Sequence, residues 1–277
     1  MAELPEIETL RRELDKELAQ KKIKTVEIMA LKSLPRYKAK SEFTGELEGH
    51  KILGLERKGP FLVAKIDGGT ALLIDLGTGG QLVRVKSAKQ VASKGTQAIF
   101  TFTQGGQLRI VDTTGHVEMW VMPYAEISDA PEFADLGLDP LDAAISWEQF
   151  GRMLYQRAGK LSALLNDRTF IVGIGPAYSD EILFAAGLRH ERESNQLTGQ
   201  EVRRLYRAVI EIMQDAVKFR SSNHAAKASS GDPFDEDGSE HFKVWERAGE
   251  TCRRCRRELK KLKTGNRFIY FCEACQV

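Results

Sequence analysis

Long apolar runs are missing from this sequence of 277 residues, and cysteine is rare, with four copies. A membrane-spanning helix needs roughly 18 consecutive apolar residues, and no segment approaches that length. The first twenty residues are too acidic and too polar to form a signal or transit peptide. These absences argue against a membrane protein and against export, so we expect a protein of the cytoplasm with no membrane partner.

The four cysteines all lie within the last 26 residues, as two Cys-x2-Cys pairs. Cys252 and Cys255 form the first pair, sixteen residues follow, and Cys272 and Cys275 form the second. This spacing is typical of a tetrahedral zinc site, in which four thiolates surround the metal and leave no position for chemistry. We therefore predict one structural Zn²⁺ per chain. A redox role is less favoured, because the strand–helix–strand context of thioredoxin-like sites is missing around both pairs.

Positive charge is concentrated around these cysteines. Residues 243–267 include ten lysines or arginines and three glutamates, a net charge of +7, whereas the whole chain carries +2. Such a concentration beside a metal module is typical of a surface that displaces counterions from phosphates. We therefore predict that this segment binds nucleic acid. The alternative is a solvated basic hairpin that stabilises only its own fold.

The composition, 42% hydrophobic and 29% charged, is that of a globular chain long enough for two domains. Residues 5–21 are predicted to form a helix, because apolar residues recur there every three to four positions. Short segments rich in β-branched and aromatic residues follow, separated by turns such as 67–69 and 104–106. They predict a sandwich-like or barrel-like β domain, with strands at 23–28, 62–66, 71–74, 98–102 and 108–111.

The pattern becomes helical after residue 131. Helices are expected at 146–154, 161–165, 177–186 and 198–219, with Ser146 and Thr198 as N-terminal caps. Residues 221–241 are small, polar and acidic, a composition that cannot bury a core and predicts a flexible linker. The predicted division is a β-sandwich domain at 1–125, a helical domain at 131–220, the linker at 221–241 and a zinc finger at 242–277.

Three motifs, in this order, resemble those of the formamidopyrimidine-DNA glycosylase / endonuclease VIII family. Residues 2–9 (AELPEIET) resemble its N-terminal signature, residues 170–184 (FIVGIGPAYSDEILF) its helix–two-turn–helix motif, and residues 252–276 its zinc finger. The resemblance covers nearly the whole chain. It implies an α+β multidomain fold, with an N-terminal helix on a β-sandwich, a helix–two-turn–helix domain and a C-terminal zinc-finger hairpin. It also implies a monomer that binds damaged double-stranded DNA at the nucleoid.

The resemblance implies a bifunctional chemistry. In the family the N-terminal amine attacks C1′ of an everted, damaged nucleotide, a glutamate moves protons, a hairpin lysine assists, and elimination nicks the strand. The matching positions here are Ala2, exposed once Met1 is removed, and Glu3. Lys58 is the lysine nearest to the hairpin position. The alternative role for the first-turn glutamates is to complement the helix dipole.

The resemblance also identifies candidate DNA-binding residues. Gly175 matches the motif's turn, where backbone approaches a phosphate at a helix N-terminus. Tyr178 and Arg267 match family positions, and Arg267 lies five residues before Cys272. Lys160 lies close to a position at which the family places a lysine near DNA.

The sequence departs from the family where the chemistry is performed. Ala2 replaces a proline, and its imine needs a proton to act as an electron sink. Pro60 occupies the hairpin lysine position, and Thr78 occupies the position of a methionine that fills the space left by the everted base. The loop at residues 112–117 lacks the family's arginine and phenylalanine, although His116 offers a ring that could stack. Pro176 replaces a phosphate-binding asparagine.

These departures leave two main hypotheses. One is an active glycosylase that removes oxidised bases in base-excision repair, with weak or lost AP-lyase activity. The other is a catalytically inactive paralogue that still binds damaged DNA. A third is a protein-interaction module that reuses the zinc hairpin.

Overall fold

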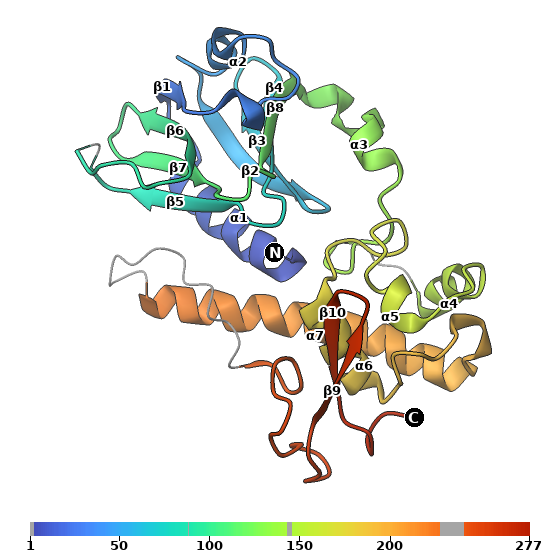
Figure 1. Cartoon of the computed structure of the whole chain (residues 1–277). Coiled ribbons are helices and arrows are strands. Elements are labelled where there is room, and N and C mark those ends of the chain that lie inside the picture. The colour runs from blue at the N-terminus through green and yellow to red at the C-terminus, as the bar shows by residue number, and fades with distance from the viewer. Residues whose placement is uncertain (1–2, 88, 143–145, 228–240) are drawn as a thin grey trace. The chain divides into compact units, whose positions relative to one another are not determined.

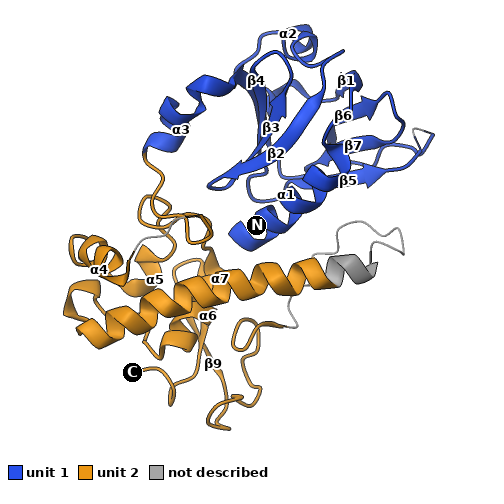
Figure 2. Ribbon diagram, turned by 180° about the vertical axis from the view of Figure 1, so that it is seen from behind, with its two compact units in different colours: residues 1–134, 223–235 blue, residues 135–222, 236–277 orange. Residues whose placement is uncertain are grey.

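The computed structural model describes residues 3–87, 89–142, 146–227 and 241–277. The chain divides into two compact units (Figure 2), of which the first contains residues 1–134 and 223–235 and the second residues 135–222 and 236–277. None of the described helices is both long and apolar enough to cross a bilayer. Each unit has a core of its own, and the two are described separately below.

The first unit is a β-sandwich with a helix against it (Figure 1). Both sheets are four-stranded and antiparallel, with strand orders β1-β6-β7-β5 and β2-β3-β4-β8. This confirms the predicted sandwich. The strands are β1 (Ile23–Ile28), β2 (Ile52–Lys58), β3 (Phe61–Ile66), β4 (Thr70–Asp75), β5 (Gln81–Val85), β6 (Thr96–Phe102), β7 (Gln107–Val111) and β8 (Glu118–Pro123).

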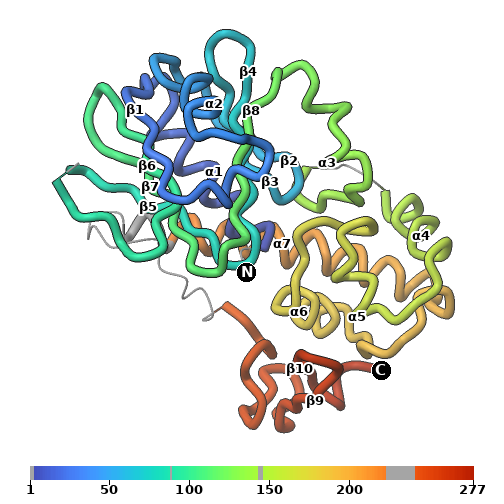
Figure 3. Tube along the Cα trace, turned by 45° about the horizontal axis from the view of Figure 1, so that its top comes forward, coloured from blue at the N-terminus to red at the C-terminus, as the bar shows by residue number. Residues whose placement is uncertain are grey.

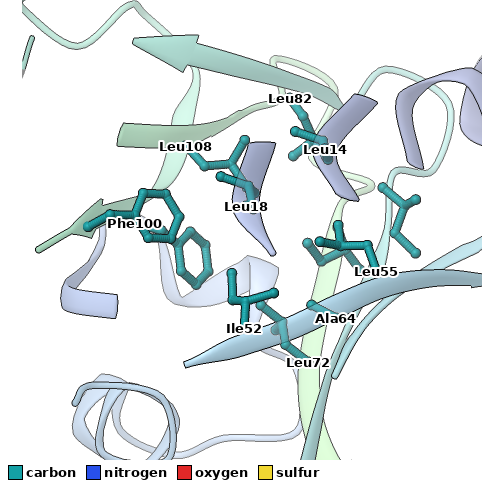
Figure 4. Close-up of a pocket in the computed structure, with 12 residues that line it drawn as sticks. Leu14, Leu18, Ile52, Leu55, Ala64, Leu72, Leu82, Phe100 and Leu108 are labelled. Atoms are coloured by element: carbon teal, nitrogen blue, oxygen red, sulfur yellow. The ribbon is translucent and has the colours of Figure 1, made fainter. Parts of the chain in front are cut away.

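Helix α1 (Leu4–Leu18) begins with Pro5 in its first turn, where the missing N–H removes no helical hydrogen bond. Leu14 and Leu18 are fully buried and line one apolar pocket with side chains from both sheets (Figure 4). Burying a leucine stabilises a fold by about 1.5–3 kcal/mol, so these two contacts hold the helix firmly on the sandwich. The short elements of this unit are η1 (Leu31–Ser33), α2 (Lys40–Gly45), η2 (Tyr124–Asp129) and α3 (Pro131–Ala134).

The second unit is helical and carries the cysteine hairpin. Its elements are α4 (Trp147–Tyr155), α5 (Leu161–Leu164), α6 (Pro176–Ala186), η3 (Ser194–Gln196), α7 (Gly199–Lys227) as far as residue 222, β9 (Lys260–Thr264) and β10 (Arg267–Phe271). Ser146 caps α4 through a hydrogen bond from the Gln149 N–H, as the sequence predicts. Strands β9 and β10 lie side by side as an antiparallel pair (Figure 3).

Two sequence-based boundaries differ from the structure. Helix α7 continues to Lys227, so the segment predicted as a linker begins inside a helix, and residues 228–240 lie outside the described residues. The hairpin predicted as a separate zinc-finger domain belongs to the same compact unit as residues 135–222. The physical reason is a shared core, in which Phe184 of α6 packs with Val244, Leu259 and two of the cysteines.

Candidate functional site

The four cysteines form a cluster that fits a tetrahedral metal ion. Their sulfur atoms all lie within 4.8 Å of one another, with Cys252 and Cys275 3.9 Å apart and Cys255 and Cys272 3.4 Å apart. A Zn–S bond of about 2.3 Å gives a tetrahedron with edges of about 3.8 Å. The observed separations bracket that value. The structure therefore brings together all four residues that the spacing predicted as metal ligands.

Polar contacts hold the cysteine loops in this geometry. The Arg254 N–H donates to Sγ of Cys252 at 3.4 Å, and the Cys272 N–H donates to the Gln276 side chain at 2.8 Å. The Arg257 backbone N–H lowers the pKa of Cys255 to about 7, whereas burial raises the pKa of Cys275 to about 12. A bound cation would stabilise all four thiolates, because it supplies the charge that the buried sulfurs need.

Two acidic residues of α6 attach the cysteine hairpin to the helical unit. Glu181 is buried, and one of its carboxylate oxygens accepts hydrogen bonds from three successive backbone N–H groups, at 2.7–2.9 Å, in Lys243, Val244 and Trp245. The neighbouring Asp180 accepts the Tyr270 N–H at 2.7 Å. Charge-assisted hydrogen bonds of this kind are among the stronger polar contacts in proteins, so the hairpin is held on α6 as a rigid block.

Positive side chains converge around His190. Burial lowers the pKa of this histidine, and Arg189, Arg267 and Lys160 lower it further, opposed by the Glu191 carboxylate 3.0 Å from Nδ1. Two predicted DNA-binding residues therefore lie near His190. They are Lys160, the exposed N-terminal cap of α5, and Arg267, at the start of β10. Nη1 of Arg267 is buried and has no hydrogen-bond partner within the described part of the chain. An anion such as a phosphate would supply that partner. Sequence reasoning missed His190, since no motif contains it.

The turn before α6 places Gly175 and Pro176 at the N-terminus of that helix. Gly175 is the N-terminal cap of α6 in an extended conformation, and Pro176 is the first helical residue. The Tyr178 side chain, predicted to contact DNA, is only 1% exposed. It packs against Phe242, with ring centroids 5.5 Å apart, and its hydroxyl accepts a hydrogen bond from Arg220 at 3.4 Å. This placement favours a packing role for Tyr178 over the predicted contact.

The predicted catalytic residues belong to the sandwich unit. Ala2 lies outside the described residues, and Glu3 is buried at the start of α1, where its N–H donates to the Glu6 carboxylate at 2.8 Å. Glu6 thus accepts the N–H of the N-cap residue in the first turn of α1, a position where its charge also complements the helix dipole. Nζ of Lys58 donates to the Ile127 carbonyl at 3.3 Å and lies 4.8 Å from the centroid of the Phe133 ring. Lys58 is therefore occupied by contacts with the segment after β8.

The turn between β2 and β3 presents Pro60 at its tip. Lys58 pairs with Phe61, so Gly59 and Pro60 form a two-residue turn, and Gly59 has a φ of +54° that favours glycine. The turn is tied to α1 through Arg57, which is buried and donates to the Gly59 carbonyl at 2.8 Å and to Glu8 at 3.1 Å.

Glu8 is the centre of this connection. Burial raises its pKa, but hydrogen bonds from Arg11, Arg12 and Arg57 outweigh that effect and leave the pKa lowered. The carboxylate therefore stays ionised and links the first turns of α1 to the hairpin tip. Sequence reasoning did not single out Glu8 or Arg57. The spacing of Glu8 from Arg11 and Arg12 by three and four residues was the available signal.

Two loops of the sandwich unit meet at the positions predicted to face a lesion. The Thr78 hydroxyl lies 2.7 Å from Nδ1 of His116, and both side chains are exposed. Asp112 fixes the second loop by accepting hydrogen bonds from Thr114, His116 and Val117 at 2.6–2.9 Å. A Cβ on Gly77 would lie 2.6 Å from the His116 carbonyl oxygen, so the close approach requires glycine there.

Comparisons with known proteins agree with this architecture. The family model of the formamidopyrimidine-DNA glycosylase N-terminal domain matches residues 1–118, and that of the family's H2TH domain matches residues 136–227. A formamidopyrimidine-DNA glycosylase from Pelotomaculum thermopropionicum is 32% identical over 100% of this chain and 99% of its own length.

Solved structures agree as well. Lactococcus lactis Fpg in complex with DNA containing an abasic site superimposes with a TM-score of 0.88 at 27% identity, over 99% of both chains. The same enzyme in complex with DNA containing Fapy-dG gives a TM-score of 0.87 with the same identity and coverage. Two matching domain models in the expected order and a full-length relative place this chain in the formamidopyrimidine-DNA glycosylase family of base-excision repair DNA glycosylases.

Proposed function

We propose that this chain binds damaged duplex DNA and removes oxidised bases, and that its AP-lyase activity is weak or absent. The observation that carries the second part is the hairpin tip. Pro60 has no amine, and the nearest lysine, Lys58, is engaged by the Ile127 carbonyl and the Phe133 ring. Among the described residues, this turn therefore presents no free lysine to assist elimination.

Base excision makes smaller demands on the site. With Met1 removed, the Ala2 amine attacks C1′ of an everted nucleotide, and the bond to the damaged base breaks as that base takes up a proton. Glu3 is the carboxylate beside Ala2 in the chain, and its burial suits it to hold or pass a proton. A Schiff base formed by a primary amine needs a further proton before it withdraws electrons, so elimination suffers more than excision.

The second unit supplies DNA affinity. Arg267 offers a buried guanidinium nitrogen that has no partner within the described residues, and Lys160 acts on the same locality. The turn at Gly175 forms the N-terminus of α6, where backbone N–H groups would bind a DNA phosphate. We propose that the cysteine cluster holds Zn²⁺, which would be structural. We also propose that the protein acts as a monomer in the cytoplasm, associated with the nucleoid.

An inactive DNA-binding paralogue is the second candidate. The exposed Thr78–His116 pair favours it, because a short polar pair cannot fill the apolar space that an everted base leaves. Pro176 favours it as well, since it offers no side-chain amide to a phosphate.

Borohydride trapping together with strand cleavage, both measured on duplexes containing abasic sites and a panel of oxidised bases, separates these possibilities. We expect base release, a covalent adduct that borohydride traps and little strand cleavage, and more strand cleavage from Pro60→Lys, which restores an amine at the tip. Ala2→Lys, whose bulky second residue blocks removal of Met1, should lose base release. Efficient strand cleavage at the abasic site by the unchanged chain contradicts weak lyase activity. Absence of both adduct and release across the panel favours the inactive paralogue.

A further inference from the structure

The β9–β10 hairpin has two faces of different character. Directly opposed residues of an antiparallel pair lie on the same face, and neighbours along a strand lie on opposite faces. Phe268 pairs with Lys263, and Tyr270 pairs with Lys261. These four residues define the outer face of the hairpin. On the other face Ile269 is buried, whereas Leu262, which pairs with it, is exposed.

Phe268 is the unusual residue of this outer face. It is 42% exposed, and it is the one phenylalanine with an exposed side chain among those the structure describes. Nζ of Lys261 lies 5.1 Å from the centroid of its ring, and Lys261 and Lys263 are both exposed. An aromatic ring is thus presented to solvent beside two exposed lysines.

The aromatic surface continues beyond Phe268. The half-buried Tyr270 packs edge-to-face against Trp245 at 5.1 Å. The backbone of both residues is fixed to α6, that of Trp245 by Glu181 and that of Tyr270 by Asp180. Burial raises the pKa of Tyr270, and the nearby carboxylates of Glu246 and Asp180 raise it further. The rings are therefore held in place before any ligand arrives.

Exposed aromatic rings between lysines suit a single-stranded nucleic acid. Unpaired bases stack on rings while lysines neutralise the adjacent phosphates, whereas the bases of an intact duplex are already stacked. We propose that the outer face of the hairpin binds single-stranded nucleic acid, with a base stacked on Phe268. This surface is distinct from that of Arg267, whose side chain lies on the opposite face of β10.

The test uses the full chain with bound metal and lesion-free 12-nucleotide oligothymidylate and oligouridylate, with affinity measured by fluorescence anisotropy. Phe268→Ala should weaken binding of both by about tenfold, in line with the loss of one stacked base. Phe268→Leu, which keeps an apolar side chain, should lose as much, and Phe268→Trp should retain affinity.

Lys261→Ala should weaken binding. The matched control Lys260→Ala, on the other face and in an ion pair with Glu258, should change it less. Metal content confirms that each variant is folded.

Three results would overturn the proposal. Phe268→Ala and Phe268→Leu could bind both oligonucleotides as tightly as the unchanged chain, or their affinity for a blunt undamaged duplex could fall by the same factor. A poly-aspartate peptide that binds more tightly than the oligonucleotides, and loses its affinity in Phe268→Ala, would assign the surface to an acidic protein instead. Because no probe contains a lesion, failure here is separate from failure of the glycosylase proposal.

Discussion

The hydroxyl of Thr78 and Nδ1 of His116 lie 2.7 Å apart, although the two residues are 38 positions apart in the chain. The pair joins the loop after β4 to the loop after β7. Gly77 permits the close approach, and the Asp112 carboxylate accepts a hydrogen bond from the His116 N–H. The two exposed side chains are therefore presented as one polar unit.

The pair should behave as a unit in DNA binding. Thr78→Val and His116→Ala should each weaken affinity for a duplex with an abasic-site analogue by roughly threefold, and the double variant should lose little more. The physical reason is that either change breaks the same hydrogen bond. Anisotropy titrations of the four proteins complete the cycle, with Thr103→Val as a control in a distant turn. Fully additive losses would contradict coupling between the two loops.

Asp112 should make the sandwich unit sensitive to acid. Burial raises its pKa, but hydrogen bonds from Thr114, Val117 and Gly115 outweigh this and hold it well below the usual range. A depressed folded-state pKa contributes stability that is present above the unfolded value, near 3.9, and is lost as the pH falls below it. Asp112→Asn should lower stability at pH 7 by about 2 kcal/mol and flatten its decline below about pH 4.

Urea unfolding between pH 7 and pH 3 measures this effect. Asp135→Asn, which changes an exposed carboxylate, serves as the control. The prediction fails if Asp112→Asn and the unchanged chain decline in parallel at low pH.

Glu181 should be a main anchor of the cysteine hairpin. Glu181→Ala leaves three backbone N–H groups without their acceptor and should cost about 3 kcal/mol or more, whereas Glu181→Gln should cost about 1–2 kcal/mol. Hydrogen exchange at Lys243, Val244 and Trp245 reports the loss directly, and these amides should exchange faster. Glu211→Gln, on the exposed side of α7, should leave them unchanged. Equal exchange in all variants would rule out the anchoring role.

Metal removal should loosen the hairpin and spare the sandwich. Binding energy and folding energy are shared at such sites, so chelation should expose the amides of β9 and β10 and speed proteolysis at Arg256 and Arg257. The amides of β3 and β4 should keep their protection. Added Zn²⁺ should reverse the change, and Cys272→Ser should reproduce it. A hairpin that keeps its protection without metal would contradict a structural role for the ion.

Arg267 should contribute one phosphate contact. Arg267→Ala should weaken duplex affinity and reduce the slope of log affinity against log salt by about one. Arg168→Ala provides a comparison with the same loss of charge elsewhere in the unit. An unchanged slope would refute the contact, even if affinity fell for other reasons.

Local patterns predicted much of the fold. Helix α1, the capped helix α4 and the strands β1, β3, β4, β6 and β7 follow from periodicity and turn residues. Strands β2, β5 and β8 were missed. In β2 a glycine interrupts the alternation, and the strand is secured instead by a distant contact, the Leu55 N–H donating to Asp15 at 2.7 Å. In β5 the charged Arg84 interrupts a short apolar segment, and β8 ends in proline.

The site was predictable where one short segment contains the information. Cysteine spacing alone identified the metal cluster. The connection from Glu8 to Arg57 was not predictable, since 49 residues separate the two and nothing local marks them as partners. Tyr178 is the opposite case. Its position in the motif predicted a contact with DNA, whereas its side chain is buried in the core.

Asp180 and Glu181 are neighbours in the chain, yet they bind distant segments. Glu181 binds backbone that begins 62 residues further on, and Asp180 binds backbone 90 residues further on. A hairpin transplanted from a relative would need the same two carboxylates beneath it to dock. Substitutions in α6 and in the hairpin are therefore expected to be inherited together. We expect α6 and the cysteine hairpin to be exchanged between relatives together, because replacing one alone would break these hydrogen bonds.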